Sequence, residues 1–193
     1  MRSFLGKTNR FTWRSLEHSD AIFLQNAIQE SIDDSEWYYF PVYQNLKTKE
    51  QLKHHISSYL LQAELRNGGL FGVFDSDNKL LGTLYLYWVS EERESAAIGF
   101  WLSKTARQKG VLAEVLPSFL QFLFSELKLN RIEAEVALSN KKSISVLEKA
   151  FFVQEGLARE YAKVNGTFED FYHYSLIFSD FQLSGAVKQK MIE

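Results

Sequence analysis

The stretch IGFWLSKTARQKGVLAE, residues 98–114, carries most of the information about the fold. Its apolar first half predicts a buried strand that ends near Leu102, and its second half predicts a helix that begins near Lys109. The first backbone N–H groups of a helix have no partner within the helix, and the helix dipole favours negative charge at that end. Gly110 has no side chain to obstruct an approaching anion.

Positive side chains surround this predicted turn, since Lys104, Arg107 and Lys109 all fall within it. We therefore interpret Arg107 to Ala113 as a strand-to-helix loop that cradles the phosphates of a nucleotide-type ligand. The alternative interpretation is an ordinary loop that carries a solvated basic patch.

Periodicity outside this stretch predicts further helices and strands. Helical spacing follows the capping residues Ser19 and Asp20 and recurs over residues 48–65, 109–127 and 143–151. Strand patterns cover residues 10–16, 70–74, 80–89, 96–102, 131–138, 153–164 and 168–178, and Asn165-Gly166 predicts the turn of a closing hairpin. This order predicts an α/β (α+β) fold with a mainly antiparallel sheet flanked by helices. Pro117 lies inside one predicted helix, where we expect a kink.

The composition is that of one ordered globular domain over residues 1–193, because 46% of residues are hydrophobic and 24% are charged. The formal net charge of -2 gives no basic footprint for nucleic acid. The absence of cysteine excludes disulfides, thiolate metal sites and a cysteine nucleophile. No apolar stretch approaches the ~20 residues that span a bilayer, and the N-terminus does not read as a signal peptide. We expect a cytoplasmic protein with no metal, nucleic-acid or membrane partner.

Two motifs resemble the signatures of the GNAT N-acetyltransferase superfamily. The first is Arg107-x-x-Gly110, which follows a strand ending in Gly-Phe-Trp-Leu and resembles the acetyl-CoA signature; Leu112 stands where that signature ends in a small residue. The second runs from Asn140 through Ser143 and Val-Leu-Glu-Lys to Phe152-Val-Gln-Glu-Gly. It resembles the branch of ribosomal-protein N-terminal (alanine) acetyltransferases, although Phe151 replaces a glycine of that pattern, so we expect a local difference in the turn.

The resemblance covers almost the whole chain and implies the acyl-CoA N-acyltransferase fold. This is a mainly antiparallel, seven-stranded sheet that splays between its fourth strand, residues 96–102, and its fifth, residues 131–138. The pantetheine arm of the co-substrate acetyl-CoA would lie in the opening. The implied cofactor-binding residues are Trp101, Leu102, Arg107, Gln108, Lys109, Gly110, Val111, Leu112, Ala113, Asn140, Ser143 and Lys149.

The mechanism that the resemblance implies is direct attack of an amine on the thioester in a ternary complex. An α-amino group, with a pKa of ~7.7–8.0, is partly neutral at pH 7, whereas a lysine amine with a pKa of ~10.4 would need far more help. Backbone N–H groups near Trp101 and Leu102 are our candidates for polarising the thioester carbonyl.

Two catalytic positions of the superfamily are altered in this chain. Leu147 replaces the tyrosine that often protonates the leaving thiolate, and we name Ser143 as its substitute; the alternative for Ser143 is a hydrogen bond at a helix start. Ala97 stands where a carboxylate often acts as base, and we name Glu160 as the replacement; the alternative for Glu160 is a solvated strand residue. His173 could act as the base instead, but a lone histidine in a strand is more often structural.

These observations predict an acetyl-CoA-dependent N-acetyltransferase, monomeric or homodimeric, whose acceptor is a primary amine, most like the N-terminal amine of a ribosomal protein. The aromatic residues Trp37, Tyr38 and Tyr39, with the final hairpin, would form the acceptor pocket; alternatively they anchor a loop. One alternative function is acetylation of a small amine, such as a drug, a polyamine or an amino sugar. Another is a non-catalytic acyl-CoA-binding module, which the altered positions Leu147 and Ala97 leave open.

Overall fold

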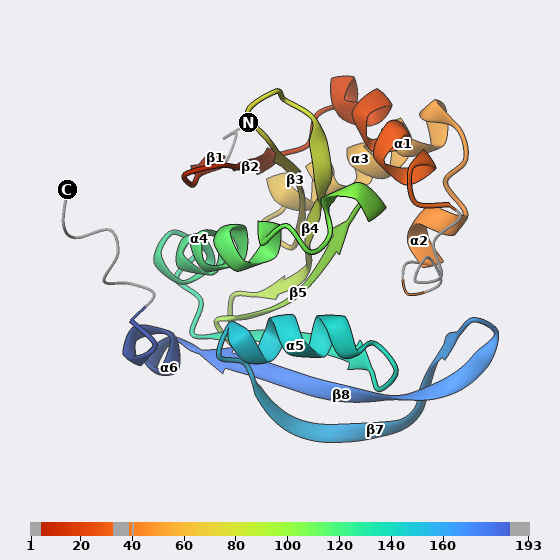
Figure 1. The fold of residues 1–193 in the computed structure, drawn as a ribbon. Helices are drawn as coiled ribbons and strands as arrows, with labels where there is room; N and C mark the ends of the chain where they lie inside the picture. The colour runs from red at the N-terminus through yellow and green to blue at the C-terminus, as the bar shows by residue number, and fades with distance from the viewer. Residues whose placement is uncertain (1–4, 33–38, 40, 186–193) are drawn as a thin grey trace.

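The computed structural model describes residues 5–32, 39 and 41–185, and in them one sheet separates two layers of helices (Figure 1). The sheet has eight strands: β1 (Leu5–Lys7), β2 (Thr12–Ser15), β3 (Gly69–Phe74), β4 (Leu80–Ser90), β5 (Ser95–Leu102), β6 (Arg131–Ala137), β7 (Val153–Val164) and β8 (Thr167–Ile177). The sequence predicts seven strands. The additional one, β1, has only three residues, too few to carry a periodic pattern.

The helices cover both faces of the sheet. They are η1 (His18–Asp20), α1 (Ala21–Gln29), α2 (Pro41–Gln44), α3 (Lys49–Glu64), η3 (Lys104–Ala106), α4 (Val111–Ser125), α5 (Lys141–Lys149) and α6 (Phe178–Leu183). Helices α4 and α5 pack on the face that includes Ile98 of β5, and α1 and α3 pack on the face that includes Trp101. In the part of the chain that the structure describes, no helix is long and apolar enough to cross a membrane.

The strand order is β1-β2-β3-β4-β5-β6-β8-β7, and the sheet opens in the middle. All neighbouring strands are antiparallel except β5 and β6, which run parallel and pair only from Ser95 opposite Arg131 to Ala97 opposite Glu133. Beyond those pairs the two strands diverge. The expected splay between residues 96–102 and 131–138 is therefore confirmed.

Two helix starts differ slightly from the prediction for local reasons. Gly110 precedes α4 with φ 75°, a left-handed conformation that favours glycine, so the helix begins at Val111 rather than at Lys109. The side-chain Oδ1 of Asn140 accepts a hydrogen bond from the backbone N–H of Ser143 (3.1 Å), which caps α5 and lets it begin at Lys141. Helix α4 continues through Pro117 to Ser125.

An aromatic cluster holds the N-terminal strands against α4. The ring of Trp13 in β2 packs edge-on against Phe71 and Phe119 at centroid distances of 5.7 and 5.2 Å. Its Nε1 donates to Ser118 Oγ (3.2 Å). Edge-to-face ring pairs stabilise beyond their buried area, so α4, which forms one wall of the opening, is held at a fixed height above the sheet.

The close approach of β4 to β5 yields a stability prediction. A Cβ atom added at Gly82 would lie 2.1 Å from the backbone oxygen of Trp101, so Gly82→Ala forces these strands apart. We expect the unfolding free energy to fall by about 2 kcal/mol or more, as for overpacked cores. Gly156→Ala is the matched control, because nothing lies within 4 Å of its added Cβ. Urea denaturation measures both, and equal stability of the two variants would contradict the prediction.

Candidate active site

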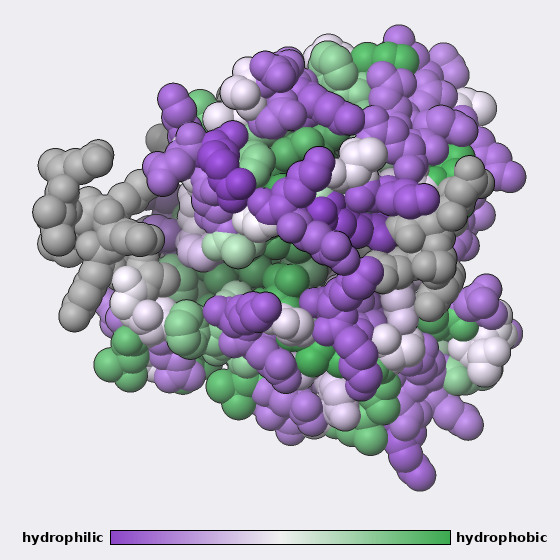
Figure 2. Space-filling model, in the orientation of Figure 1, coloured by the Kyte–Doolittle hydropathy of each residue, from purple (hydrophilic) through white to green (hydrophobic). Residues whose placement is uncertain are grey.

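Two adjoining cavities occupy the opening between β5 and β6. The first, here the α4 cavity, has a volume of about 570 Å³ and lies between α4 and α5. The second, here the β7 cavity, has a volume of about 530 Å³ and lies between β4, β5, β6 and the β7–β8 hairpin. Tyr39, Phe100, Asn140 and Ser143 line both cavities, so the cavities meet at these residues. Figure 2 shows apolar side chains at the base of the hollow between α4 and α5, with hydrophilic residues around it.

The α4 cavity is built around the loop that precedes α4. Gln108 and Gly110 both have left-handed backbones, with φ of 60° and 75°, which curl the chain tightly before the helix begins. No side chain caps the helix at Gly110. The N–H groups of the first helical turn, at Val111, Leu112 and Ala113, have no acceptor within the helix. Such a turn, with its positive dipole end, is suited to an anion.

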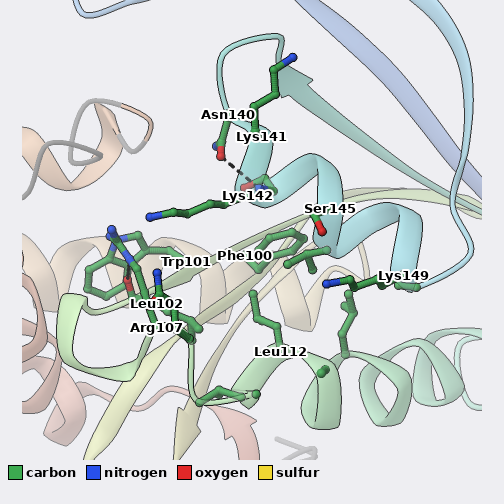
Figure 3. A pocket seen from close by; sticks show the side chains of 18 of the residues that line it. Phe100, Trp101, Leu102, Arg107, Leu112, Asn140, Lys141, Lys142, Ser145 and Lys149 are labelled. Carbon is green, nitrogen blue, oxygen red and sulfur yellow. Dashed lines mark hydrogen bonds between the residues drawn. The ribbon is translucent and has the colours of Figure 1, made fainter.

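Cationic side chains flank the same cavity. Arg107 donates from Nε to the backbone oxygen of Leu102 (3.1 Å), which holds its guanidinium at the end of β5. Lys142 extends toward Arg107 from the opposite wall, and Lys149 lies across from Leu112 (Figure 3). The inner lining is apolar and includes Phe100. The cavity therefore combines an anion site with an apolar channel.

The N-terminal turn braces the loop before α4 from outside. Arg10 donates from Nε to Glu114 Oε2 (2.7 Å), and Thr8 Oγ1 donates to Glu114 Oε1 (2.7 Å). Arg10 also donates from Nη1 to the backbone oxygen of Lys109 (3.3 Å). These contacts attach the β1–β2 turn to the loop and to the first turn of α4.

The β7 cavity has a different chemical character. Its walls include the aromatic side chains of Tyr87, Trp88, Tyr161 and Phe171. Glu135 on β6 lies among them and accepts a hydrogen bond at Oε2 from the hydroxyl of Tyr161 (2.6 Å). The Glu135 side chain is 44% exposed, so a solute that enters the cavity can reach it. A carboxylate between aromatic rings is suited to an ammonium group.

The bulge in β4 places Tyr87 in this cavity. The register of β4 against β5 shifts between Leu86 and Trp88, so Tyr87 is the additional residue. Its ring lies over Gly99, where an added Cβ would approach within 2.6 Å of it. Burial of the phenol, the nearby Tyr59 and the negative charge of Glu135 raise the pKa of Tyr87. Tyr87 therefore stays protonated and can donate a hydrogen bond into the cavity.

A hydrogen-bonded chain fixes the junction between the cavities. The hydroxyl of Tyr39 donates to Ser139 Oγ (2.7 Å), which donates to Glu169 Oε2 (2.9 Å). The backbone N–H of Ser139 donates to Glu169 Oε1 (2.6 Å). Because Ser139 directly precedes Asn140, this chain ties the start of α5 to β8 and to Tyr39.

Most of the predicted site residues come together here. Of the predicted cofactor-binding residues all but Lys109 line the α4 cavity: Trp101, Leu102, Arg107, Gln108, Gly110, Val111, Leu112, Ala113, Asn140, Ser143 and Lys149. The side chain of Trp101 points into the opposite core, against Tyr43 at 5.0 Å, so only its backbone can serve the opening. Trp37 and Tyr38 lie outside the described residues.

The two predicted catalytic side chains have different positions. Ser143 lies at the junction of the cavities. Glu160 is exposed and lines neither cavity, and its backbone N–H donates to Asp170 Oδ1 (2.8 Å). The structure brings Glu135 to the site instead. Sequence reasoning missed Glu135 because the alternation along β6 makes it, like Glu133, a solvated carboxylate. Its position on the strand that borders the splay was the available signal.

A buried polar cluster supports the β7 cavity from behind. The hydroxyl of Tyr43 lies 2.8 Å from Thr83 Oγ1, and His55 Nε2 lies 3.2 Å from the hydroxyl of Tyr85. The ring of Tyr85 stacks on that of Tyr87 with centroids 5.3 Å apart. Burial, with a smaller effect of the adjacent His54, lowers the pKa of His55 to about 4.

Sequence comparison finds a family and close relatives. The model of the acetyltransferase (GNAT) domain matches residues 10–153. The chain is 36% identical over 159 residues to "Probable N-acetyltransferase YjcK" of Bacillus subtilis, covering 81% of this chain and 88% of that protein. It is 35% identical over 101 residues to "Putative ribosomal N-acetyltransferase YdaF" of the same organism, covering 52% and 55% respectively.

Structure comparison finds the same fold. A structure of RimL, described as a ribosomal L7/L12 alpha-N-protein acetyltransferase in complex with coenzyme A, superposes with a TM-score of 0.80. The match covers 92% of this chain and 99% of that chain at 18% sequence identity. At this identity the similarity establishes a shared fold.

The lowered pKa of His55 predicts a pH dependence of stability. The folded state keeps this ring neutral to about pH 4, whereas the unfolded chain binds a proton below about pH 6.5, so stability falls as the pH falls through that window. We expect the unfolding free energy to fall by roughly 2 kcal/mol over this range, because solvent around the partly exposed ring screens some of the effect of the pKa shift. Urea denaturation from pH 7 to pH 4 should show a shallower loss in His55→Gln. The control His54→Gln should lose nearly as much stability as the unsubstituted chain over the same pH range. An equal loss of stability in His55→Gln and the unsubstituted chain would contradict the assignment to His55.

Proposed function

Since the chain belongs to the acetyltransferase (GNAT) domain family, we propose that it transfers the acetyl group of acetyl-CoA to the α-amine of a protein N-terminus. The observation that carries this proposal is the meeting of two unlike cavities at Phe100, Asn140 and Ser143. One is suited to an anionic, elongated ligand, and the other to an ammonium group.

Each part of acetyl-CoA has a matching group of residues in the α4 cavity. The N–H groups of Val111, Leu112 and Ala113 would receive the pyrophosphate, and Arg107 would add positive charge. The apolar lining would enclose the pantetheine arm, and the edge of β5 beyond Ala97, which β6 does not cover, would bond its amides. When bound, the thioester supplies the activated acetyl group. Holding it against the acceptor accounts for several kcal/mol of the barrier.

On the acceptor side, Glu135 attracts the ammonium form of the amine and accepts its proton. An α-amine, with a pKa near ~8, needs only this modest assistance at neutral pH. Ser143 lies at the junction, where its hydroxyl can supply a proton to the departing sulfur. Trp101 and Leu102 line the α4 cavity, and backbone N–H groups near them would stabilise the developing oxyanion.

A protein N-terminus is favoured over a small amine by two considerations. YdaF, which shares 35% identity over about half of this chain, carries a name that refers to ribosomal N-acetylation. The β7 cavity also extends from Glu135 on β6 to Val164 at the end of β7, so an extended chain could lie along the hairpin.

The phosphate loop gives a binding prediction. Acetyl-CoA should raise the melting temperature of the protein, and Gly110→Glu should abolish the effect. A side chain at φ 75° is strained, and a carboxylate there repels phosphate. Gly185→Glu is the matched control: its φ is 76°, nothing lies within 4 Å of the added Cβ, and it lies beyond α6. This variant should keep the shift. A shift no larger with acetyl-CoA than with ADP would contradict the cofactor assignment.

The acceptor class is tested by kinetics with the full-length chain. Release of the CoA thiol is followed with peptides that have free N-termini, with the same peptides blocked at the N-terminus but containing lysine, and with spermidine or an amino sugar. We expect kcat/KM at least about tenfold higher for free N-termini, because an α-amine is far more often neutral than a lysine amine. Turnover of small amines alone would favour a small-molecule acetyltransferase. Binding without turnover of any amine would contradict the enzymatic proposal.

A further inference from the structure

Strand β7 contains an irregularity beside the acceptor cavity. Ala158 pairs with Phe171 and Ala162 pairs with Glu169. Three residues of β7 (159–161) therefore lie opposite the single residue Asp170 of β8. Bulges of this kind redirect a side chain and are enriched beside functional sites.

The bulge adopts an unfavourable backbone that a specific contact holds. Glu160 has φ 48°, a left-handed conformation that costs a residue other than glycine roughly 1–2 kcal/mol. Its backbone N–H donates to Asp170 Oδ1 (2.8 Å). The backbone oxygen of Asp170 in turn accepts from the N–H of Leu138, just beyond the end of β6 (3.1 Å). Asp170 on β8 thus links the bulge in β7 to the end of β6.

The consequence of the bulge is the position of Tyr161. Its ring crosses β8, packing on Phe171 and edge-on to His173 with centroids 5.3 and 5.5 Å away. The hydroxyl then reaches β6, where it donates to Glu135 Oε2 (2.6 Å). This hydrogen bond to the carboxylate, with burial, raises the pKa of Tyr161 to about 12, so the phenol is a constant donor.

We propose that Tyr161 is a positioning residue for the transfer reaction: the Asp170-held bulge directs its hydroxyl onto Glu135, which fixes the direction of the carboxylate that receives the acceptor amine. This inference rests on the proposed function and adds to it how Glu135 is held. Glu160, by contrast, acts through its backbone conformation.

The groups that face Glu135 come from three strands. They are Tyr161 on β7, His173 on β8, whose Nδ1 lies 3.7 Å from Oε1, and Tyr87 on β4. Of these contacts, the hydrogen bond from Tyr161 holds Oε2 of Glu135 in one direction, toward the cavity. Removing the hydroxyl therefore frees the Glu135 side chain to rotate.

The test is steady-state kinetics at pH 7.5, with kcat and KM measured separately for an N-terminal peptide and for acetyl-CoA. In Tyr161→Phe we expect kcat/KM for the peptide to fall about tenfold, because Glu135 loses the hydrogen bond that holds it, with KM for acetyl-CoA unchanged. Glu135→Ala should lower kcat/KM at least as far, and adding Tyr161→Phe to it should cause no further loss. Tyr172→Phe, on the adjacent strand and in neither cavity, is the matched control and should stay within about twofold.

A second pair of variants tests the origin of the placement. Asp170→Asn keeps an oxygen that can accept from the Glu160 N–H and should retain activity within about twofold. Asp170→Ala should reproduce Tyr161→Phe, and the double variant should be no worse than either alone, because both remove the same hydrogen bond. If Asp170→Ala does not fold, Tyr161→Phe decides alone.

An unchanged kcat/KM for the peptide in Tyr161→Phe, or effects of Tyr161→Phe and Asp170→Ala that multiply, would overturn the positioning role. That outcome differs from failure of the proposed function, in which the unsubstituted chain acetylates no peptide.

Discussion

The parallel pairing of β5 with β6 ends after Ala97 and Glu133, and the rest of the site depends on that ending. Backbone N–H and C=O groups along the edge of a strand need partners. From Ile98 to Leu102, β5 pairs with β4 on one side and faces the opening on the other. A ligand that carries amides can pair with this edge as a further strand would. The opening is therefore a gap in the sheet that leaves this edge accessible to a ligand.

Rigid contacts keep the opening from closing. Trp13 and its ring partners hold α4 over the N-terminal half of the sheet, and the chain from Tyr39 through Ser139 to Glu169 holds the start of α5 to β8. Gly99 leaves room for Tyr87 on the opposite face. Because each wall is braced by contacts outside the opening, the cavities exist without a ligand, which lowers the entropic cost of binding.

Sequence patterns predicted the parts of the site that follow from local structure. The loop before α4 could be predicted because a glycine, nearby cations and a helix start are adjacent along the chain. Glu135 was missed although its strand was expected to border the splay, because the alternation along β6 does not distinguish it from Glu133. The direction of the Tyr161 side chain was harder still to predict. Side chains alternate between the two faces only along a regular strand, and the bulge in β7 interrupts this alternation. The same bulge makes Glu160, the predicted base, an exposed residue, while Tyr161 beside it enters the cavity.

In the proposed reaction, cofactor and acceptor meet at the junction lined by Phe100, Asn140 and Ser143. The most direct test is a crystal structure with a bisubstrate analogue in which CoA is joined through an acetyl bridge to a peptide N-terminus. We expect the pyrophosphate at the N–H groups of residues 111–113, the sulfur at the junction, and the peptide nitrogen beside Glu135. A sulfur outside the junction, or a peptide that leaves the β7 cavity empty, would contradict it.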